Sequence, residues 1–477
     1  MESIWNIPQK QYGGELIGNI EREIVVVGGG IAGILTSYQL AERGYKVTLV
    51  EADKLYSGVT KNTTAHIEAV QGLIYSELIK HSYNTAKHFY HSQMEAIENY
   101  QKIINRYEID CEFERVDSYI FAINEKEKLL KEYDALMKIG AKPKLIKNLQ
   151  KFNFCADAVM VKNQAVFHPI KFLEALPKNF EIIENTRIKK IDTKLNLLFS
   201  EKGSIFAKKI IIATNFPIIN IPGWYFLRMY KSTSYAVALK INQYINEIYQ
   251  STEENGLTFR GYKDYLIIGG LDHRTGRTNY TDKYKQLENT AKEIYPDAKA
   301  EYFWSSNDCI TFDGMPLIGN YSKRLNNIYI ITGFNKLGMA NAMASSLLIA
   351  DLVEQKKNKY EELFKPTRKK HGVTSIFINS AETFKNIIIK PIAPVFKTEK
   401  SLKNNSGDIV YYKGKKRAVY KDENGELHII KPLCAHLKCQ LEFNENEKTW
   451  DCPCHGSRYD IDGNIITAPT VKKQQKE

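Results

Sequence analysis

The sequence predicts a parallel α/β domain that is interrupted by a mixed α+β region and followed by a small all-β domain. At 477 residues and 54.8 kDa the chain is too long for a single hydrophobic core. A strand, a glycine-rich turn, a helix and a second strand follow one another over residues 23–51. Short strand-like runs separated by turns fill residues 408–431, and four of the seven cysteines crowd into residues 434–454. Hydrophobic residues make up 43% and charged residues 26%, as in ordinary globular proteins.

The turn at residues 28–33 (GGGIAG) has the spacing of a dinucleotide-binding loop of Rossmann type. Gly28 allows the tight turn, Gly30 lets the backbone approach a pyrophosphate, and Gly33 lets helix and strand pack closely. The start of the following helix offers amide hydrogens and a positive dipole end to phosphates. Glu51 ends the second strand, where an acid accepts hydrogen bonds from a ribose. The unit therefore predicts a bound dinucleotide.

Four later segments favour FAD over NAD, because they resemble the FAD-dependent D-amino-acid oxidase (DAO) superfamily in kind and in order. They are Ser57–His66, Lys209–Asn215, Asp313–Gly319 and Gly333–Met339. The last is a second glycine turn that follows a strand and leads into a helix rich in small residues. A helix N-terminus there suits the polar end of a flavin ring. Only one dinucleotide fingerprint occurs, which argues against a separate NAD(P)H domain.

The resemblance covers roughly residues 20–355 and implies an FAD-dependent oxidoreductase domain over residues 1–355. Its FAD-binding parts would be residues 20–80, 150–220 and 305–355, with a substrate-binding part of mixed sheet between them. The flavin contacts implied are Thr63, Thr64, Gly333, Gly338 and Met339, and the backbone near Ile188 would face the adenine. Within these parts we expect helices at 82–107 and 125–139 and strands at 113–123, 234–239 and 265–269.

Candidate catalytic side chains are His273 and His66. His273 lies on a glycine-rich turn, and His66 follows the proposed flavin-contacting threonines. Either imidazole could accept a proton or contact a substrate, and either could instead be a surface residue without a catalytic role. Three arginines, Arg228, Arg260 and Arg274, could bind a substrate carboxylate. Cys309 fits a covalent flavin link or a buried structural thiol.

Residues 356–400 are expected to form a connector, and residues 401–477 the all-β domain. Strands are expected at 408–412, 416–420 and 427–431. Two loops follow with the frame Cys-x-His, fifteen residues, Cys-x-x-His. The four residues of this frame are Cys434, His436, Cys452 and His455. This set supplies two thiolates to one iron and two imidazoles to the other iron of a [2Fe–2S] cluster of Rieske type.

A structural zinc ion is the alternative to the cluster, because zinc is also bound by two cysteines and two histidines. Zinc fingers usually separate paired ligands by two or more residues and need no extra cysteines, whereas each loop here carries a second thiol. The pattern resembles the Rieske proteins of cytochrome bc complexes. That resemblance implies a disulfide between Cys439 and Cys454 and hydroxyl donors to sulfur at Ser457 and Tyr459. The chain departs from the pattern at Lys438, where a glycine is common.

A flavin takes two electrons from an organic substrate, and a [2Fe–2S] cluster carries one at a time. A DAO-like flavoprotein followed by a Rieske domain resembles a group of bacterial fusion proteins. It implies an enzyme that oxidises a small amine or amino acid at FAD and passes single electrons to the cluster. We expect the exposed edges of His436 and His455 to be the electron exit toward an external donor or acceptor protein.

Other functions fit the sequence less well. A redox carrier or sensor would have the cofactors but no organic substrate. A nucleic-acid-modifying flavoprotein would suit the net charge of +12, yet lysines are spread along the chain and no recognition module is visible. A Rieske oxygenase would need a separate mononuclear iron site, for which we find no ligand set. The sequence shows neither a signal peptide nor a membrane span, so a cytoplasmic location is expected.

Overall fold

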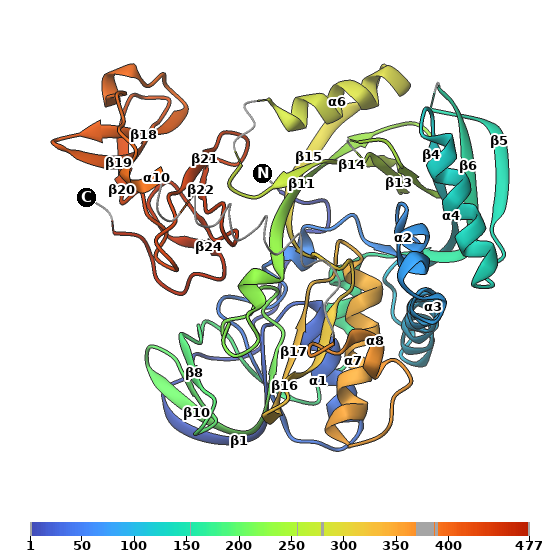
Figure 1. Cartoon of the computed structure of the whole chain (residues 1–477), viewed down its shortest axis with the longest axis horizontal. Helices are drawn as coiled ribbons and strands as arrows, with labels where there is room; N and C mark the ends of the chain where they lie inside the picture. The colour runs from blue at the N-terminus through green and yellow to red at the C-terminus, as the bar shows by residue number, and fades with distance from the viewer. Residues whose placement is uncertain are drawn as a thin grey trace.

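The structure is a computed structural model that describes residues 2–152, 154–254, 256–277, 281–368, 386 and 390–475. Two large sheets and two small ones carry the fold (Figure 1). The expected fold class, an α/β domain with a mixed insertion and a small all-β domain, is confirmed. Part of the expected connector, residues 369–385 and 387–389, lies outside the described residues.

The first large sheet has eight strands and a parallel centre, in which β1 lies between β10 and β2. Its main path runs β16-β17-β10-β1-β2-β7, and β9 pairs with β8 and β10. The strands are β1 (Gly18–Val27), β2 (Val47–Val50), β7 (Glu181–Ile183), β8 (Lys190–Asp192), β9 (Leu197–Phe199), β10 (Gly203–Ile212), β16 (Leu317–Ser322) and β17 (Leu325–Thr332).

Helices α1 (Ile31–Glu42) and α7 (Gly338–Val353) pack against each other beside this sheet (Figure 1). Both are rich in alanine and other small or apolar residues, so most of each helix is buried. Helix α1 ends before Gly44, whose φ of +87° suits a glycine that stops a helix. Neighbouring residues of β1 belong to two different buried clusters, with Val26 in one and Val25 in the other, so this strand is buried on both faces, as in parallel sheets.

The second large sheet has nine strands and forms the inserted region. Its path runs β15-β11-β14-β13-β12-β4-β6-β3, with β5 paired to β6. The strands are β3 (His66–Ile67), β4 (Glu114–Ala122), β5 (Lys144–Lys151), β6 (Phe154–Val166), β11 (Met229–Lys240), β12 (Ile248–Ser251), β13 (Thr258–Tyr262), β14 (Tyr265–Arg274) and β15 (Lys299–Thr311). The strands expected at 113–123, 234–239 and 265–269 are confirmed as β4 and parts of β11 and β14.

The remaining helices lie mainly around the inserted region. They are η1 (Val59–Lys61), α2 (Ile74–His81), α3 (Tyr83–Arg106), α4 (Lys126–Lys138), α5 (Pro169–Ala175), η2 (Tyr225–Leu227), α6 (Lys283–Ile294), α8 (Glu361–Phe364), α10 (Lys390–Ile392) and η4 (Glu399–Ser401). The expected helices at 82–107 and 125–139 are confirmed as α3 and α4. Ser82 caps α3 by accepting from the Thr85 N–H at 3.3 Å.

Two small antiparallel sheets, β18 to β24, form what we call the C-terminal unit. One is β18-β19-β20 and the other β21-β22-β23-β24. Their bounds are β18 (Ser406–Tyr412), β19 (Lys415–Lys421), β20 (Leu427–Ile430), β21 (Glu442–Asn444), β22 (Thr449–Asp451), β23 (Arg458–Tyr459) and β24 (Ile465–Thr467). Trp450, Tyr459 and Leu441 are fully buried and join the four loop cysteines in one small core. The unit lies beside β11 and β15 of the inserted region (Figure 1).

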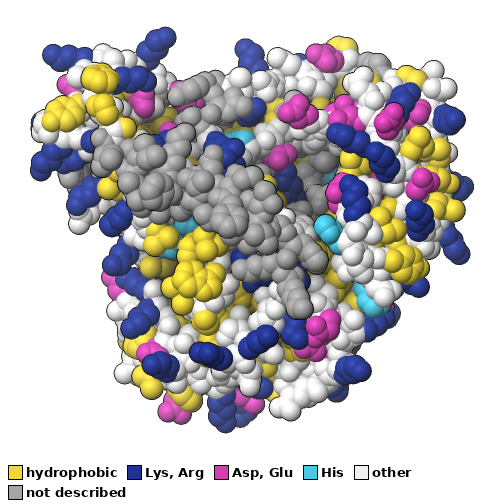
Figure 2. Space-filling model, in the orientation of Figure 1, with side chains coloured by type: hydrophobic (Ala, Val, Ile, Leu, Met, Phe, Trp, Pro, Cys, Tyr) yellow, Lys and Arg dark blue, Asp and Glu magenta, His cyan; other side chains and the backbone are white. Residues whose placement is uncertain are grey.

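Positive charge is spread over the face of the molecule that Figure 2 shows. The visible face in Figure 2 carries lysine and arginine side chains around its whole outline rather than in one patch. This agrees with the spread of lysines along the sequence, in which the net charge is +12. Among the helices that the structure describes, none is long and apolar enough to cross a membrane.

The start of α2 is capped by Glu132, a carboxylate from α4. Its oxygens accept from the Tyr75 and Ser76 N–H groups at 3.0 and 2.7 Å. Glu132 is completely buried. Burial outweighs these hydrogen bonds and raises the pKa of Glu132 from 4.5 to about 7. The folded protein therefore binds a proton here more tightly than the unfolded chain does.

We expect Glu132→Gln to remove a pH dependence of stability. The contribution of Glu132 to the free energy of unfolding is most favourable below pH 4.5, and it is lost as the pH rises to about 7. The loss is on the order of 3 kcal/mol. Unfolding in urea at pH 5, 6, 7 and 8 checks this. The wild type should lose stability relative to Glu132→Gln up to pH 7 and not beyond, whereas a constant difference would contradict the assignment.

Candidate flavin and iron–sulfur sites

A cavity of about 840 Å³ is lined by residues of both large sheets and of the C-terminal unit. We call it the shared cavity. Its wall includes the glycine loop after β1, the turn that begins α7, the end of β3 and the neighbouring strands of the inserted sheet. Residues of β24 and of the segment that follows it complete the wall, including Ile466, Thr467 and Ala468. A volume of this size is typical of cofactor and small-molecule sites.

The glycine loop is shaped so that side chains cannot be added at two positions. Gly28 has a φ of +114°, and a Cβ there would lie 2.5 Å from the Ala213 carbonyl oxygen. A Cβ on Gly33 would lie 1.9 Å from the Gly28 carbonyl oxygen. Gly30 has no such clash within the protein and lines the shared cavity. This is the division of roles that the spacing predicts, with close packing behind the loop and open backbone at Gly30.

Glu51 lies against the same loop. Its carboxylate accepts from the Gly29 N–H at 2.5 Å and from the Asp53 N–H at 3.0 Å. Burial raises the pKa of Glu51, which is consistent with a carboxylate enclosed in the cavity wall. Nine of the ten residues expected to contact the nucleotide or flavin line the cavity, and Gly33 lies behind the loop. The nine are Gly28, Gly30, Glu51, Thr63, Thr64, Ile188, Gly333, Gly338 and Met339.

The two candidate catalytic histidines are not brought together. Among the described residues of the cavity wall, His66 is present and His273 is not. The His273 ring stacks on Tyr235 with centroids 5.8 Å apart, and burial lowers its pKa. His66 instead lines the wall, and its buried Nε2 has no hydrogen-bond partner among the residues that the structure describes. The structure therefore offers His66, and not His273, to a ligand in the cavity.

A carboxylate that sequence reasoning missed accompanies His66. Glu68 is 3% exposed, lines the cavity, and has Oε2 3.1 Å from His66 Nδ1. The only signal for it in the sequence is the His-x-Glu spacing, which puts both side chains on one face of an extended segment. Its other partners, Ser118 and Gln250, come from strands far away in the sequence.

The three arginines expected to bind a carboxylate are used elsewhere or lie off the cavity wall. Arg260 donates to the Thr64 and Ala65 carbonyl oxygens at 2.8 and 2.7 Å and packs on Trp5. Arg228 donates to the Pro366 carbonyl oxygen at 2.7 Å. Arg274 lies over the ring of Tyr230. Arg260 thus holds the loop that precedes His66, because its donors satisfy buried backbone carbonyls.

Cys309 and Lys231 face each other across β15 and β11 and line the cavity. Cys309 has Sγ 2.8 Å from Asn215 Oδ1, and burial raises the pKa of its thiol to about 12. Lys231 donates to the Ala468 carbonyl oxygen at 2.9 Å, which ties the inserted sheet to the C-terminal unit. Burial lowers the pKa of Lys231 to about 8.

The four candidate cluster ligands meet at one end of the C-terminal unit. Cys434 and Cys452 are buried thiols, and the rings of His436 and His455 lie 5.3 Å apart at 84°. Burial lowers the pKa of His436 to about 4 and that of His455 to about 3, so both rings are neutral at pH 7. The Nδ1 atoms of both histidines are buried, and no residue in the described part of the chain hydrogen-bonds to them. Two buried thiols and two orphaned imidazole nitrogens suit a metal cluster with two sulfur and two nitrogen ligands.

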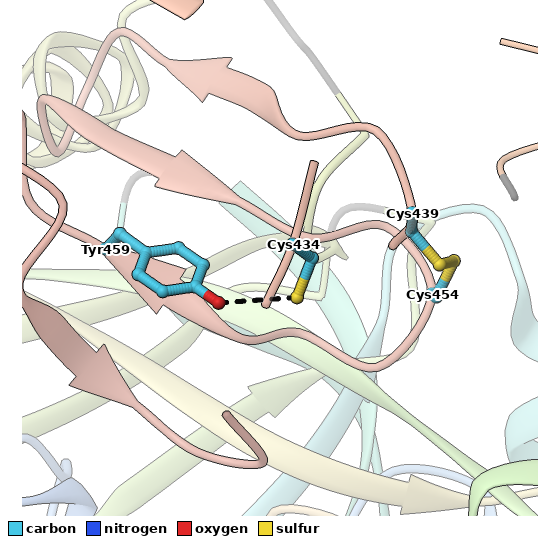
Figure 3. The surroundings of a disulfide bond; sticks show 4 residues. All are labelled: Cys434, Cys439, Cys454 and Tyr459. Carbon is cyan, nitrogen blue, oxygen red and sulfur yellow. Dashed lines mark hydrogen bonds between the residues drawn. A yellow bond between two sulfur atoms is a disulfide. The ribbon is translucent and has the colours of Figure 1, made fainter. Parts of the chain in front are cut away.

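The extra thiols, Cys439 and Cys454, are joined in a disulfide that links the two ligand loops (Figure 3). Their Cα atoms lie 6.5 Å apart, within the ordinary range. The Sγ atoms of Cys439, Cys452 and Cys454 all lie within 4.8 Å of one another. A zinc site built on these three is excluded by the disulfide, because metal binding requires free thiolates. The Tyr459 hydroxyl lies 3.4 Å from Cys434 Sγ, as the resemblance implies (Figure 3).

The exit expected at both histidines is wrong for His455. This side chain is 1% exposed. Its ring centroid lies 5.9 Å from that of Phe216 and 5.7 Å from that of Phe226. Both phenylalanines belong to the segment between β10 and β11. His436 is only half-buried, and Leu437 beside it is 40% exposed. The C-terminal unit therefore turns one histidine inward to the flavoprotein part and leaves the other near solvent.

Two glycines let this interface close. A Cβ on Gly456 would lie 2.5 Å from Lys231 Cβ, and one on Gly276 would lie 2.3 Å from the Pro453 nitrogen. Glu447 adds polar contacts, because its carboxylate accepts from the Ser305 hydroxyl at 2.7 Å and from the Tyr284 hydroxyl. Close backbone approach at the second ligand loop and hydrogen bonds at Glu447, in the turn between β21 and β22, hold the C-terminal unit against the inserted region.

Fold and sites together define a flavoprotein oxidoreductase that carries an iron–sulfur electron-transfer domain. The chain belongs to the FAD dependent oxidoreductase (DAO) family, whose family model matches residues 23–352. The model of the Rieske [2Fe-2S] domain matches residues 393–476. The protein is thus an FAD- and [2Fe–2S]-containing oxidoreductase.

Individual relatives agree with this assignment. YhfW of Bacillus subtilis (strain 168), which bears the name of a Rieske 2Fe-2S iron-sulfur protein, is 32% identical over 471 residues, 95% of this chain and 92% of its own. L-proline dehydrogenase from P. horikoshii has a similar fold, with a TM-score of 0.62 and 21% identity over 74% of this chain and 98% of its own. Glycine oxidase from Geobacillus kaustophilus also has a similar fold, with a TM-score of 0.61 and 18% identity over 74% of this chain and 100% of its own.

Proposed function

We propose that the protein is a dehydrogenase that oxidises a small amine or amino acid at FAD and passes the electrons singly to its own Rieske cluster. The observation that carries the proposal is the shared cavity, whose wall joins the glycine loop of the flavoprotein part to residues of β24 and of the segment that follows it. The inward-facing His455 supports it, since one candidate cluster ligand is buried against the flavoprotein part. Two redox sites held against each other in one chain favour internal electron exchange over two separate activities.

In this proposal FAD is held by the loop Gly28–Gly33, Glu51, the Thr63-Thr64 turn, the backbone at Ile188 and the Gly333–Met339 turn. The cluster is held by Cys434, His436, Cys452 and His455, and the disulfide between Cys439 and Cys454 fixes their loops. When bound, FAD accepts a hydride equivalent, and the cluster carries one electron at a time.

The chain's own residues would keep the two sites dry and oriented. Phe216 and Phe226 exclude water from one side of His455, and the Lys231–Ala468 hydrogen bond holds the loop beyond β24 against β11. His436, which is only half-buried, is then the natural edge for exchange with an external one-electron partner protein. A low-dielectric interface of this kind favours transfer within the chain over leakage to solvent.

The proposal is tested by spectroscopy on protein purified without oxygen. Candidate amines and amino acids are added while the flavin absorption and the EPR signal of the reduced cluster are recorded. We expect at least one compound to bleach the flavin, with a Rieske signal rising in step. A flavin and cluster that are both present but inert to every compound would replace the proposal with a carrier or sensor. Salt-sensitive binding of RNA together with that inertness would favour nucleic-acid modification instead.

A further inference from the structure

Glu68 lies in a buried hydrogen-bond network whose other members donate to its carboxylate. The Ser118 hydroxyl donates to Glu68 Oε1 at 2.6 Å, and Gln250 Nε2 lies 2.7 and 2.8 Å from the two carboxylate oxygens. The orientation of the Gln250 amide is fixed, because its oxygen accepts from the Gly72 N–H at 3.1 Å. Both neighbours thus present donors, which is the environment that an ionised carboxylate requires.

The network also fixes the tautomer of His66. Since Glu68 can only accept, the nearby Nδ1 of His66 at 3.1 Å carries the hydrogen and donates it. The other ring nitrogen, Nε2, then carries a lone pair and no hydrogen. This atom is buried, and no described residue of the chain hydrogen-bonds to it. Because His66 lines the shared cavity, Nε2 is an acceptor that remains open to a ligand.

The positive charges near this acceptor are already engaged. Four described lysine and arginine residues line the cavity, and each has a partner in the chain. Lys336 pairs with Asp272 at 2.8 Å, Arg187 with Asp53 at 3.0 Å, Arg458 with Asp451 at 3.0 Å, and Lys231 donates to the Ala468 carbonyl oxygen at 2.9 Å. Arg260, the cation behind the His66 strand, donates to backbone carbonyls and not to Glu68. The wall at His66 therefore presents a buried negative charge and a hydrogen-bond acceptor.

We propose that the His66–Glu68 pair recognises the ammonium group of an amine substrate and that His66 Nε2 accepts its proton. In this step one N–H bond of the substrate breaks, the electron pair stays on the substrate nitrogen, and the proton forms an imidazolium that faces the Glu68 carboxylate. The neutral amine then has the lone pair that oxidation at the neighbouring carbon needs. This inference rests on the proposed function and narrows its substrate class. The His66–Glu68 pair would select substrates by their ammonium group and not by a carboxylate.

The test uses three probes of nearly equal size and shape that carry no oxidisable C–H next to an N–H group. The tert-butylammonium ion has a positive charge and N–H donors, tetramethylammonium has the charge without donors, and pivalate has a negative charge. Each is titrated into the flavin-loaded protein, and binding is followed by the change in flavin absorption and by calorimetry. Because none of them reduces the flavin, the result does not depend on turnover or on electron transfer to the cluster.

We expect the wild type to bind tert-butylammonium at least about tenfold more tightly than pivalate, a difference of about 1.4 kcal/mol. Glu68→Gln should abolish this preference for the cation. His66→Phe should abolish the preference for tert-butylammonium over tetramethylammonium, because the acceptor is gone while Glu68 remains. Asp264→Asn removes the same charge from an exposed carboxylate of the same sheet and should leave both preferences unchanged.

Flavin content and the unfolding temperature of each variant show whether it has folded. Tight binding of pivalate to the wild type, or unchanged preferences in well-folded Glu68→Gln and His66→Phe, would overturn the inference. If the probes behave as expected but no amine bleaches the flavin, the recognition site stands and the proposed oxidation fails. The two hypotheses are thereby separated.

Discussion

Replacing His455 by glutamine is expected to abolish the Rieske EPR signal and to remove most of the iron, while FAD stays bound. His455 is one of four side chains that meet at the end of the C-terminal unit, and its buried Nδ1 has no hydrogen-bond partner within the described ranges. A cluster that loses one of its two imidazole ligands loses a bond that no nearby described residue replaces. The glycine loop lies in a different sheet, so the flavin absorption should be unaffected. Iron analysis, EPR and visible spectra of the purified protein measure the outcome.

His428→Gln is the matched control. This histidine belongs to the same unit, but its Nδ1 lies 3.1 Å from Asp462 Oδ1 and it is not among the four proposed ligands. The control should retain the full iron content and EPR signal. A His455→Gln protein with unchanged iron and an unchanged Rieske signal would show that the ligand set is assigned incorrectly. Stoichiometric zinc in the wild type would show that the metal is assigned incorrectly.

The second large effect is expected for Gly33→Val, which should yield protein without bound FAD. A Cβ at this position would lie 1.9 Å from the Gly28 carbonyl oxygen, and neither backbone can move without opening the loop. Overpacking of this kind costs roughly 1–3 kcal/mol and sometimes more. The displaced loop would no longer present the amide groups at the start of α1 to a pyrophosphate. The Rieske signal, which depends on the C-terminal unit, should remain.

Gly14→Ala controls for the loss of a glycine as such. A Cβ at Gly14 meets no atom within 4 Å, and the residue does not line the shared cavity. The control should purify with a full complement of flavin and an unchanged unfolding temperature. If Gly33→Val also retained flavin at the wild-type level, the loop after β1 would not be the nucleotide site, and the assignment of Gly28, Gly30 and Glu51 would fall with it.

Features that are local in the chain were predictable from the sequence. The loop at residues 28–33 and its acid at Glu51 lie within one β-α-β unit, and the four cluster ligands lie within residues 434–455. In both cases the chemistry is set by spacing along a short segment, because backbone geometry alone brings such residues together. The same reasoning located some of the strands and helices, among them β4, α3 and α4, whose apolar periodicity is also a local property.

The sequence could not decide which polar residues meet across the inserted sheet. The Glu68 carboxylate accepts hydrogen bonds from Ser118 and Gln250, which are 50 and 182 residues away in the chain. The arginines illustrate the same limit, since Arg260 looked available for a substrate and is instead occupied by the Thr64 and Ala65 carbonyl oxygens. Hydrogen-bond partners of a buried group depend on strand order and register, which are long-range properties.

The sequence by itself thus determined the two cofactor motifs, the order of the domains and the class of redox chemistry. Only the tertiary structure decided that His455 faces inward, that His66 and not His273 reaches the cavity, and that the C-terminal unit completes the cavity wall. The physical reason is that motifs depend on neighbours in sequence, whereas the packing of one unit on another depends on the shape of two whole surfaces. At this interface that shape includes Gly276 and Gly456, where any side chain would hold the surfaces apart.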